Sequence, residues 1–185
     1  MLQDLIASRR AVFPVQYNSE NIHREELVQI LEAANWAPTH RRTEPWRFKV
    51  FYSEESRVGL SEFLGNTYAD TVLKYSEVKR KKIMEKPLQS KCVIAICMQL
   101  DPAEMVPEWE EIAATAMAVQ NMWLTAHDLE IGAYWSSPAL KNHLGNHISL
   151  ADGEQCLGFF YMGKYTNAPP DGHRNSEISD KVVWL

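Results

Sequence analysis

The sequence predicts an α+β fold in a single domain spanning residues 1–185. Stretches with helical and strand patterns alternate irregularly, which is typical of this class. A continuous β-prone apolar run at 92–98 indicates a central strand. A second apolar stretch, at 108–130, would form a helix roughly 34 Å long at 1.5 Å per residue. This helix is about as long as a small domain is wide, so the rest of the chain is expected to pack around it.

Composition supports a globular protein of ordinary type. The chain has 185 residues, of which 45% are hydrophobic and 23% charged. Its net charge of −5 argues against a nucleic-acid surface. The N-terminus lacks the apolar core of a secretory signal, and polar residues along 108–130 argue against a membrane span. Three cysteines without CxxC spacing indicate buried thiols in a reducing compartment, so we expect a cytoplasmic protein.

The first third of the chain shows two helical patterns and a polar loop. Residues 2–8 form a short amphipathic pattern, followed by an extended segment at 12–15. Residues 21–34 predict a second helix, capped by Asn21 and ended by Pro38. A polar loop at 37–46 then leads to a predicted strand at 47–52.

The middle of the chain is mostly helical. Residues 54–86 are polar and helix-prone, and their basic run at 79–82 is best explained as a solvated helix face. Within the stretch 108–130, residues 112–126 carry no charge and have apolar residues on every side, which predicts a buried helix or a subunit interface. Gly132 is expected to stop this helix before a strand at 134–137.

The last part of the chain predicts a short helix at 139–144 and an apolar strand at 155–162. The tail at 164–180 is rich in proline and polar residues, and 181–185 could form a final strand.

Four polar places could carry chemistry, although each also has an ordinary structural explanation. They are Ser8-Arg9-Arg10, the loop Thr39–Trp46, the segment Tyr134–Ser137, and the pair Lys164 and Arg174. Arginine forks bind phosphate or carboxylate in a bidentate manner, but paired arginines are usually solvated. Tyr134–Ser137 could flank a planar ligand or simply contribute to the core.

Other types of site find little support. His143 and His147 are four residues apart, but Gly145 separates them and no HExxH motif is present, so no metal site is expected. The sequence has no GxSxG, no GxGxxG and no P-loop.

Four motifs follow one another in a fixed order along the chain. An opening helix ends in Ser8-Arg9-Arg10, and Ala37-Pro38-Thr39-His40 leads to Pro45-Trp46-Arg47-Phe48 about thirty residues later. Residues 118–124 (AVQNMWL) lead to Gly132 and an aromatic strand, and residues 159–164 read FFYMGK. Together the four motifs resemble the FMN-dependent nitroreductase family, and most closely its compact YdjA-like branch. The set is fairly specific because it keeps its order over nearly the whole chain.

The resemblance implies a mostly antiparallel sheet flanked by helices, and a homodimer with FMN sites lined by both subunits. The long helix would form the dimer core, 54–86 a helical cover, and the tail 164–185 would wrap around the partner. Arg9 and Arg10 match arginines that hold the FMN phosphate and ribityl chain, with Lys164 and Arg174 as weaker phosphate candidates. Ala11 stands where serine is common, so only its backbone would contact FMN. Thr39, His40, Trp135, Ser136 and Ser137 match positions beside the flavin.

Two residues depart from the family pattern. Arg42 stands where asparagine near the flavin ring is common, and Glu44 where glutamine precedes Pro-Trp. A carboxylate near an electron-rich flavin would disfavour its reduced form unless Arg41 or Arg42 pairs with it. These changes bear on redox potential and substrate preference more than on FMN binding.

The activity implied is transfer of hydride from NADH or NADPH through FMN to a nitro-aromatic, quinone or similar small-molecule acceptor in a ping-pong cycle. No side chain needs to act as a nucleophile, although His40 could donate a proton. The same fold could instead support dehalogenation, flavin fragmentation or oxidation of a small ring. A dimeric flavin-binding protein with little turnover is a further alternative.

Overall fold

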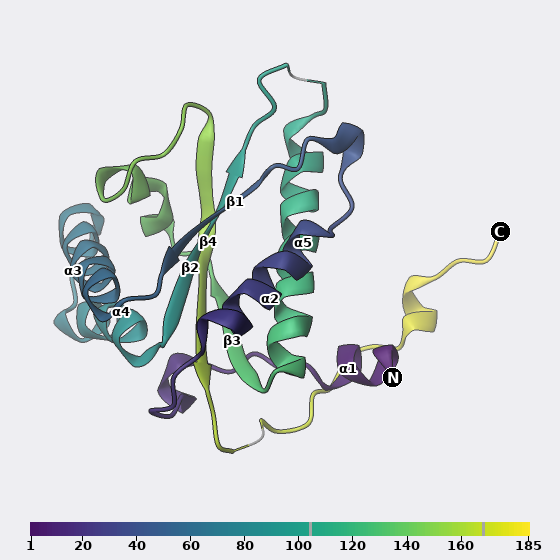
Figure 1. Ribbon diagram of the computed structural model, residues 1–185, viewed down its shortest axis with the longest axis horizontal. Coiled ribbons are helices and arrows are strands. Elements are labelled where there is room, and N and C mark those ends of the chain that lie inside the picture. The colour runs from purple at the N-terminus through teal and green to yellow at the C-terminus, as the bar shows by residue number, and fades with distance from the viewer. Residues whose placement is uncertain (104, 168) are drawn as a thin grey trace.

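The centre of the fold is an antiparallel sheet of four strands in the order β1-β2-β4-β3 (Figure 1). This computed structural model describes residues 1–103, 105–167 and 169–185. The strands are β1 (Trp46–Phe51), β2 (Cys92–Gln99), β3 (Ile131–Ser136) and β4 (Glu154–Lys164). β2 is buried along nearly all of its length because it lies between β1 and β4. The predicted central strand and antiparallel sheet are therefore confirmed.

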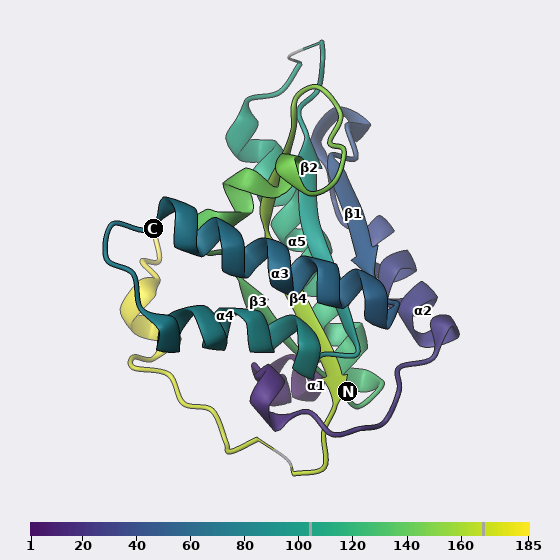
Figure 2. The same cartoon turned by 90° about the vertical axis from the view of Figure 1, so that its left-hand side faces the viewer.

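Helices cover both faces of the sheet, which gives three layers (Figures 1 and 2). The α-helices are α1 (Leu2–Ser8), α2 (Arg24–Asn35), α3 (Glu54–Thr71), α4 (Glu77–Gln89) and α5 (Glu108–Asp128). Short 3₁₀ helices are η1 (Pro14–Gln16), η2 (His40–Arg42), η3 (Ala139–Asn146) and η4 (Ile178–Lys181). α2 and α5 pack on one face, and α3, α4 and η3 lie on the other. The α+β class is confirmed.

Each sheet face has its own apolar core, because side chains of successive strand residues point to opposite faces. Ile94 and Ile96 of β2 join the core under α2 and α5, whereas Val93 and Ala95 join the core under α3 and η3. Cys92, Cys97 and Cys156 are buried free thiols, as the sequence predicts.

The segment 54–86 forms a helical hairpin. α3 and α4 are each capped by a serine, Ser53 and Ser76, whose side-chain oxygen accepts a backbone N–H in the first turn. Ser61 is buried and its hydroxyl donates to the carbonyl of Met84, which ties the two helices together. The hairpin lies on the sheet face opposite α5 (Figure 2).

α5 is long, as predicted, but within one chain only part of its surface is buried, and the alternative of a subunit interface stays a prediction. Ala114, Ala118 and Met122 are buried against the sheet and α2. Trp109 and Met117, however, are 67% and 41% exposed. One apolar face of the helix therefore has no covering element among the residues that the structure describes.

Two predicted helix boundaries are also wrong. α2 begins at Arg24 rather than near Asn21, because Ile22 is buried and the Glu26 carboxylate accepts the N–H of His23, the N-cap residue. Gly132 does not stop α5 but pairs with Gly163 inside the sheet. α5 ends earlier, where Glu130 takes a left-handed conformation with φ of 56°.

The C-terminal tail projects from the body on the side of α5 (Figure 1). Residues 178–181 form η4, and 182–185 are irregular, so the strand predicted at 181–185 does not form within this chain. Trp184 is 92% exposed. The apolar side chains of Val183 and Leu185 are exposed as well. The wrapping of the tail around a partner stays a prediction.

Candidate functional site

Arg9 and Arg10, here called the arginine segment, follow α1 directly. The Arg9 guanidinium lies 4.6 Å from the ring centre of Trp123 on α5. The Arg10 side chain donates to the carbonyls of Ala7 (2.6 Å) and Pro170 (3.3 Å), so it links α1 to the tail. An added side-chain carbon at Gly172 would lie 2.6 Å from the Arg10 guanidinium carbon, which shows how closely the tail passes. Two segments at opposite ends of the sequence are thus joined by one side chain.

Positive charge accumulates at this place. Burial lowers the pKa of Arg9, and the neighbouring charges of Arg10 and Arg174 lower it further. Within residues 1–103, 105–167 and 169–185, none of these three guanidiniums forms an ion pair with a carboxylate. Three like charges gathered without a counter-charge have the chemistry of an anion site.

The sheet fixes the backbone that carries these arginines. After Ala11, the N–H of Val12 donates to the Ala133 carbonyl of β3 at 3.0 Å. The hydroxyl of Tyr17 lies 2.8 Å from the Val12 carbonyl and 2.9 Å from the Tyr161 carbonyl, within hydrogen-bonding distance of both. The segment from Ala11 to Tyr17 is therefore held on β3 and β4.

The polar loop of 39–44 lies at the other end of α5. His40 Nδ1 is 2.5 Å from a carboxylate oxygen of Glu110 in the first turn of that helix. The hydroxyl oxygen of Thr39 accepts the N–H of Glu44 at 3.2 Å. His40 and Thr39 line a groove of about 280 Å³ with Trp109, Met117 and other apolar residues of α5.

This loop is conformationally strained. Arg41, Arg42 and Glu44 all have positive φ angles, of 52°, 58° and 44°. Each non-glycine residue in this region costs on the order of 1–3 kcal/mol. Among the described residues, neither Arg41 nor Arg42 forms an ion pair with Glu44, so the pairing considered from the sequence does not occur within the chain.

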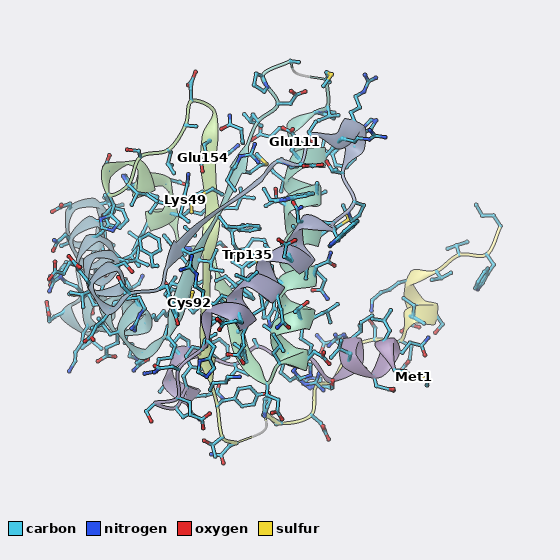
Figure 3. All side chains as sticks on the ribbon, in the orientation of Figure 1. Met1, Lys49, Cys92, Glu111, Trp135 and Glu154 are labelled. Carbon is cyan, nitrogen blue, oxygen red and sulfur yellow. The ribbon has the colours of Figure 1, made fainter. Side chains whose placement is uncertain are left out.

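A third group of candidates lies at the end of β3. Trp135 packs between the sheet and α5 (Figure 3), and its indole Nε1 is buried without a hydrogen-bond partner among the described residues. Gly158 makes room for it: an added Cβ there would contact the Trp135 indole and come within 2.7 Å of the Ser136 carbonyl. Ser137 follows directly after the strand.

Lys164 has a different environment from the other candidates. Its ammonium lies 2.7 Å from the Glu26 carboxylate and donates to the Leu129 carbonyl at 3.1 Å. This ion pair fastens α2 to β4 and neutralises the positive charge. Lys164 is thus occupied by a structural contact, whereas the charge of Arg174 acts on Arg9 and lowers its pKa.

Within one chain, the arginine segment and the His40 loop lie at opposite ends of α5. His40 contacts Glu110 near the start of the helix, and Ser8 contacts His127 near its end. The 17 residues between those contacts span about 26 Å at 1.5 Å per residue. The phosphate candidates and the His40 loop therefore do not meet within one subunit.

Comparison with known proteins identifies the family. The family model of the nitroreductase family matches residues 6–164. The chain belongs to the nitroreductase family.

Relatives and solved structures agree with this assignment. YfhC of Bacillus subtilis is 28% identical over 195 residues, covering all of this chain and 94% of YfhC. YdjA of Escherichia coli is 26% identical over 142 residues, covering 75% of each chain. Both names assign these proteins provisionally to the NAD(P)H nitroreductases. The resemblance to this branch is confirmed.

Two crystal structures share the fold over the whole chain. A nitroreductase-like family protein from Bacillus cereus has a TM-score of 0.83 at 26% identity and covers 100% of this chain and 96% of its own. A structure from Desulfovibrio desulfuricans that contains FMN has a TM-score of 0.75 at 22% identity, with the same coverage. The nitroreductase-like fold is thus shown, and family membership supports an oxidoreductase.

Three residues near the candidate site were not singled out from the sequence as site residues. Trp123, whose ring lies against the Arg9 guanidinium, belongs to the 118–124 motif but was given no role in the site. His127, which contacts Ser8, lies in a stretch predicted only as a buried helix or a subunit interface. Glu110 belongs to the acidic start of α5, a pattern that also suits the helix dipole. The aromatic and imidazole side chains near the end of an apolar helix were the available signal.

Two negative observations complete the description. Within the described residues, no helix is both long and apolar enough to cross a membrane. In the same part of the chain, no three His, Cys, Asp or Glu side chains are grouped so that they could hold a metal ion.

Proposed function

We propose that this chain is an FMN-dependent NAD(P)H oxidoreductase that reduces nitro-aromatic, quinone or similar acceptors. The observation that carries the proposal is the cluster of Arg9, Arg10 and Arg174, which lacks a carboxylate partner among the described residues of a nitroreductase-family chain. FMN, when bound, would supply the acceptance and donation of hydride. The protein would supply binding, orientation and proton placement.

The donor set suits this cofactor. Guanidiniums bind a phosphate ester through paired N–H groups. The unpartnered Trp135 Nε1 and the hydroxyls of Ser136 and Ser137 could donate to the polar edge of a planar ring system. Ala11 offers backbone contacts only. We therefore assign the arginines to the phosphate and the end of β3 to the ring.

His40 is the candidate for handling a proton. Its Nδ1 is bonded to Glu110, which leaves Nε2 as the nitrogen available to a substrate. The apolar groove beside it could hold an aromatic acceptor. Thr39 stabilises the same loop through Thr43 and Glu44.

A homodimer would bring the separated groups together. In a two-fold arrangement the same surface faces itself, so the start of one α5 can lie beside the end of the other. The exposed apolar face of α5, with Trp109 and Met117, is suited to such an interface. The projecting tail, with Trp184 exposed, would add contacts on the partner. The Thr39–His40 loop of one subunit would then complete the site of the other.

The test is an anaerobic visible spectrum of the purified protein, with FMN supplied if needed, before and after addition of NADH or NADPH. A flavin spectrum that bleaches within seconds and recovers with a nitro compound or quinone is expected. A flavin spectrum that persists would instead favour a binding protein or another flavin reaction. Absence of flavin binding would refute the proposal.

A matched pair of variants makes the test specific. Arg9→Gln should weaken FMN binding at least tenfold, because charge-assisted bonds to phosphate are lost. Arg24→Gln, at an exposed position in the first turn of α2, removes the same charge outside the cluster and should leave the affinity unchanged. Equal affinities for both variants would contradict the assignment of Arg9.

A further inference from the structure

We propose that His127 completes the phosphate-binding site and makes binding of the phosphate monoester dependent on pH. This inference rests on the proposed function, since the phosphate is that of FMN. It assigns a role to a residue that neither the motifs nor the family resemblance pointed to.

The geometry places His127 against the arginine segment. Its Nε2 lies 2.9 Å from the hydroxyl oxygen of Ser8, the last residue of α1. Trp123 lies four residues earlier, on the same side of α5, and the Arg9 guanidinium packs over its ring. Arg9 and His127 are therefore neighbours, and Ser8 connects them through the backbone.

The charges around His127 come from three segments. Arg9 and Arg10 face it from the segment after α1, and Asp128 follows it on α5. Arg174 of the tail acts on the same cluster through Arg9. The carboxylate of Asp128 favours the imidazolium, as does the C-terminal end of the α5 dipole. The two arginines oppose it.

Without an anion, the neutral imidazole is favoured. Burial lowers the pKa of His127, and the charges of Arg9 and Arg10 lower it further, against the smaller opposing effect of Asp128. The Ser8 hydroxyl also donates to the Leu5 carbonyl at 3.3 Å. A neutral imidazole can therefore accept from Ser8 through Nε2 or, in its other tautomer, donate to the Ser8 oxygen, whereas the imidazolium can only donate. Protonation therefore fixes Nε2 as a donor, and the Ser8 hydroxyl then donates to the Leu5 carbonyl or to a bound anion.

A phosphate dianion placed among the arginines would reverse this preference. An opposite charge nearby raises the pKa of an imidazole, so binding takes up a proton. The extra affinity is present at low pH and is lost as pH rises through the pKa of the bound state. Because the second pKa of a phosphate monoester is about 6, the ligand loses charge below that pH, and affinity should be highest near it.

The first measurement is the affinity of the apoprotein for FMN and for riboflavin between about pH 6 and pH 8.5, with flavin fluorescence as the readout. We expect His127→Gln to weaken FMN binding roughly tenfold near pH 6, which is the size of one charge-assisted hydrogen bond. Near pH 8.5 the loss of affinity should be much smaller. Riboflavin, which has no phosphate, should bind both proteins equally. His143→Gln, on η3 across the sheet, is the matched control. Equal pH profiles for FMN in wild type and His127→Gln would overturn the inference.

A second measurement separates this inference from the proposed function. The pKa of the His127 imidazole can be followed by NMR in the wild-type apoprotein, with and without inorganic phosphate. An upward shift caused by phosphate supports the anion site even if FMN does not bind and the proposed function fails. An unchanged His127 pKa in saturating phosphate would refute the site, whatever the fate of FMN.

Discussion

Gly163 provides the sharpest test of how the arginine segment is held. It faces Gly132 across β3 and β4, and the ring of Tyr17 lies directly over it. An added Cβ at position 163 would lie 2.8 Å from the Tyr17 Cβ and 2.5 Å from its Cδ2, and closer still to Cγ. Real Cβ atoms do not approach so closely, so Gly163→Ala requires Tyr17 to move.

That movement is costly because Tyr17 is fixed at its other end. Its hydroxyl lies within hydrogen-bonding distance of the Val12 and Tyr161 carbonyls. Overpacking of this type costs about 1–3 kcal/mol. In a chain of this size, 1 kcal/mol corresponds to about 2–4 °C in the melting temperature. Gly163→Ala should therefore melt about 2–12 °C lower, and it should also weaken FMN binding because Arg9 and Arg10 precede the displaced segment.

Thermal unfolding followed by circular dichroism is the assay, and Gly145→Ala is the control. The nearest atom to an added Cβ at Gly145 is 3.9 Å away, so that variant should melt as wild type or slightly higher. A double-mutant cycle with Tyr17→Ala locates the cause, since Gly163→Ala should cost little once the ring is absent. Equal melting temperatures for the two glycine variants, or an undiminished cost in the Tyr17→Ala background, would refute the reasoning.

Three further predictions follow from other parts of the molecule. Ile112→Glu, on the exposed face of α5, should give a monomer without FMN in size-exclusion chromatography with light scattering. Leu73→Glu, at a fully exposed position between α3 and α4, should leave the oligomeric state unchanged. A dimer of Ile112→Glu would count against the interface. Burial alone would raise the pKa of Glu26, but hydrogen bonds from Lys164 and the His23 N–H lower it overall. The ionised Glu26 carboxylate therefore stabilises the fold at neutral pH, and this contribution is lost as pH falls through the lowered pKa. Glu26→Gln should then lower the unfolding free energy by about 1–3 kcal/mol near pH 7 and flatten the acid side of a urea-denaturation pH profile; an unchanged profile would contradict this. Burial raises the pKa of Cys92 to about 12, so this thiol should react with a disulfide reagent only after denaturation. Mass spectrometry of labelled peptides is the assay, and rapid labelling of the native protein would argue against the burial of Cys92.

The family fold could be predicted from sequence because it depends on local patterns. A continuous apolar run defined β2, and an uncharged apolar stretch defined α5, since strand and helix periods are written directly in the order of residues. The ordered motifs around Arg9, His40 and Trp135 gave the family. None of these inferences needed to know which distant residues meet.

Boundaries and exposure were less predictable. Asn21 is a good cap by residue type, but burial of Ile22 moved the start of α2 to Arg24. Gly132 would suit a helix end, yet the sheet uses it where Val12 and Tyr165 pass too close for a side chain. The apolar pattern of α5 could not distinguish a face that packs on the sheet from one that a single chain leaves exposed.

The site itself was decided by contacts between residues far apart in the chain. His40 and Glu110 are separated by 70 positions, Ser8 and His127 by 119, and the Lys164–Glu26 pair by 138. Local sequence determined the strands, the helices and the family, because periodicity and motif order act over short distances. Only the tertiary structure decided that Lys164 is neutralised by Glu26 while Arg9 keeps its charge beside His127, because the partner of a charged side chain depends on how the layers pack.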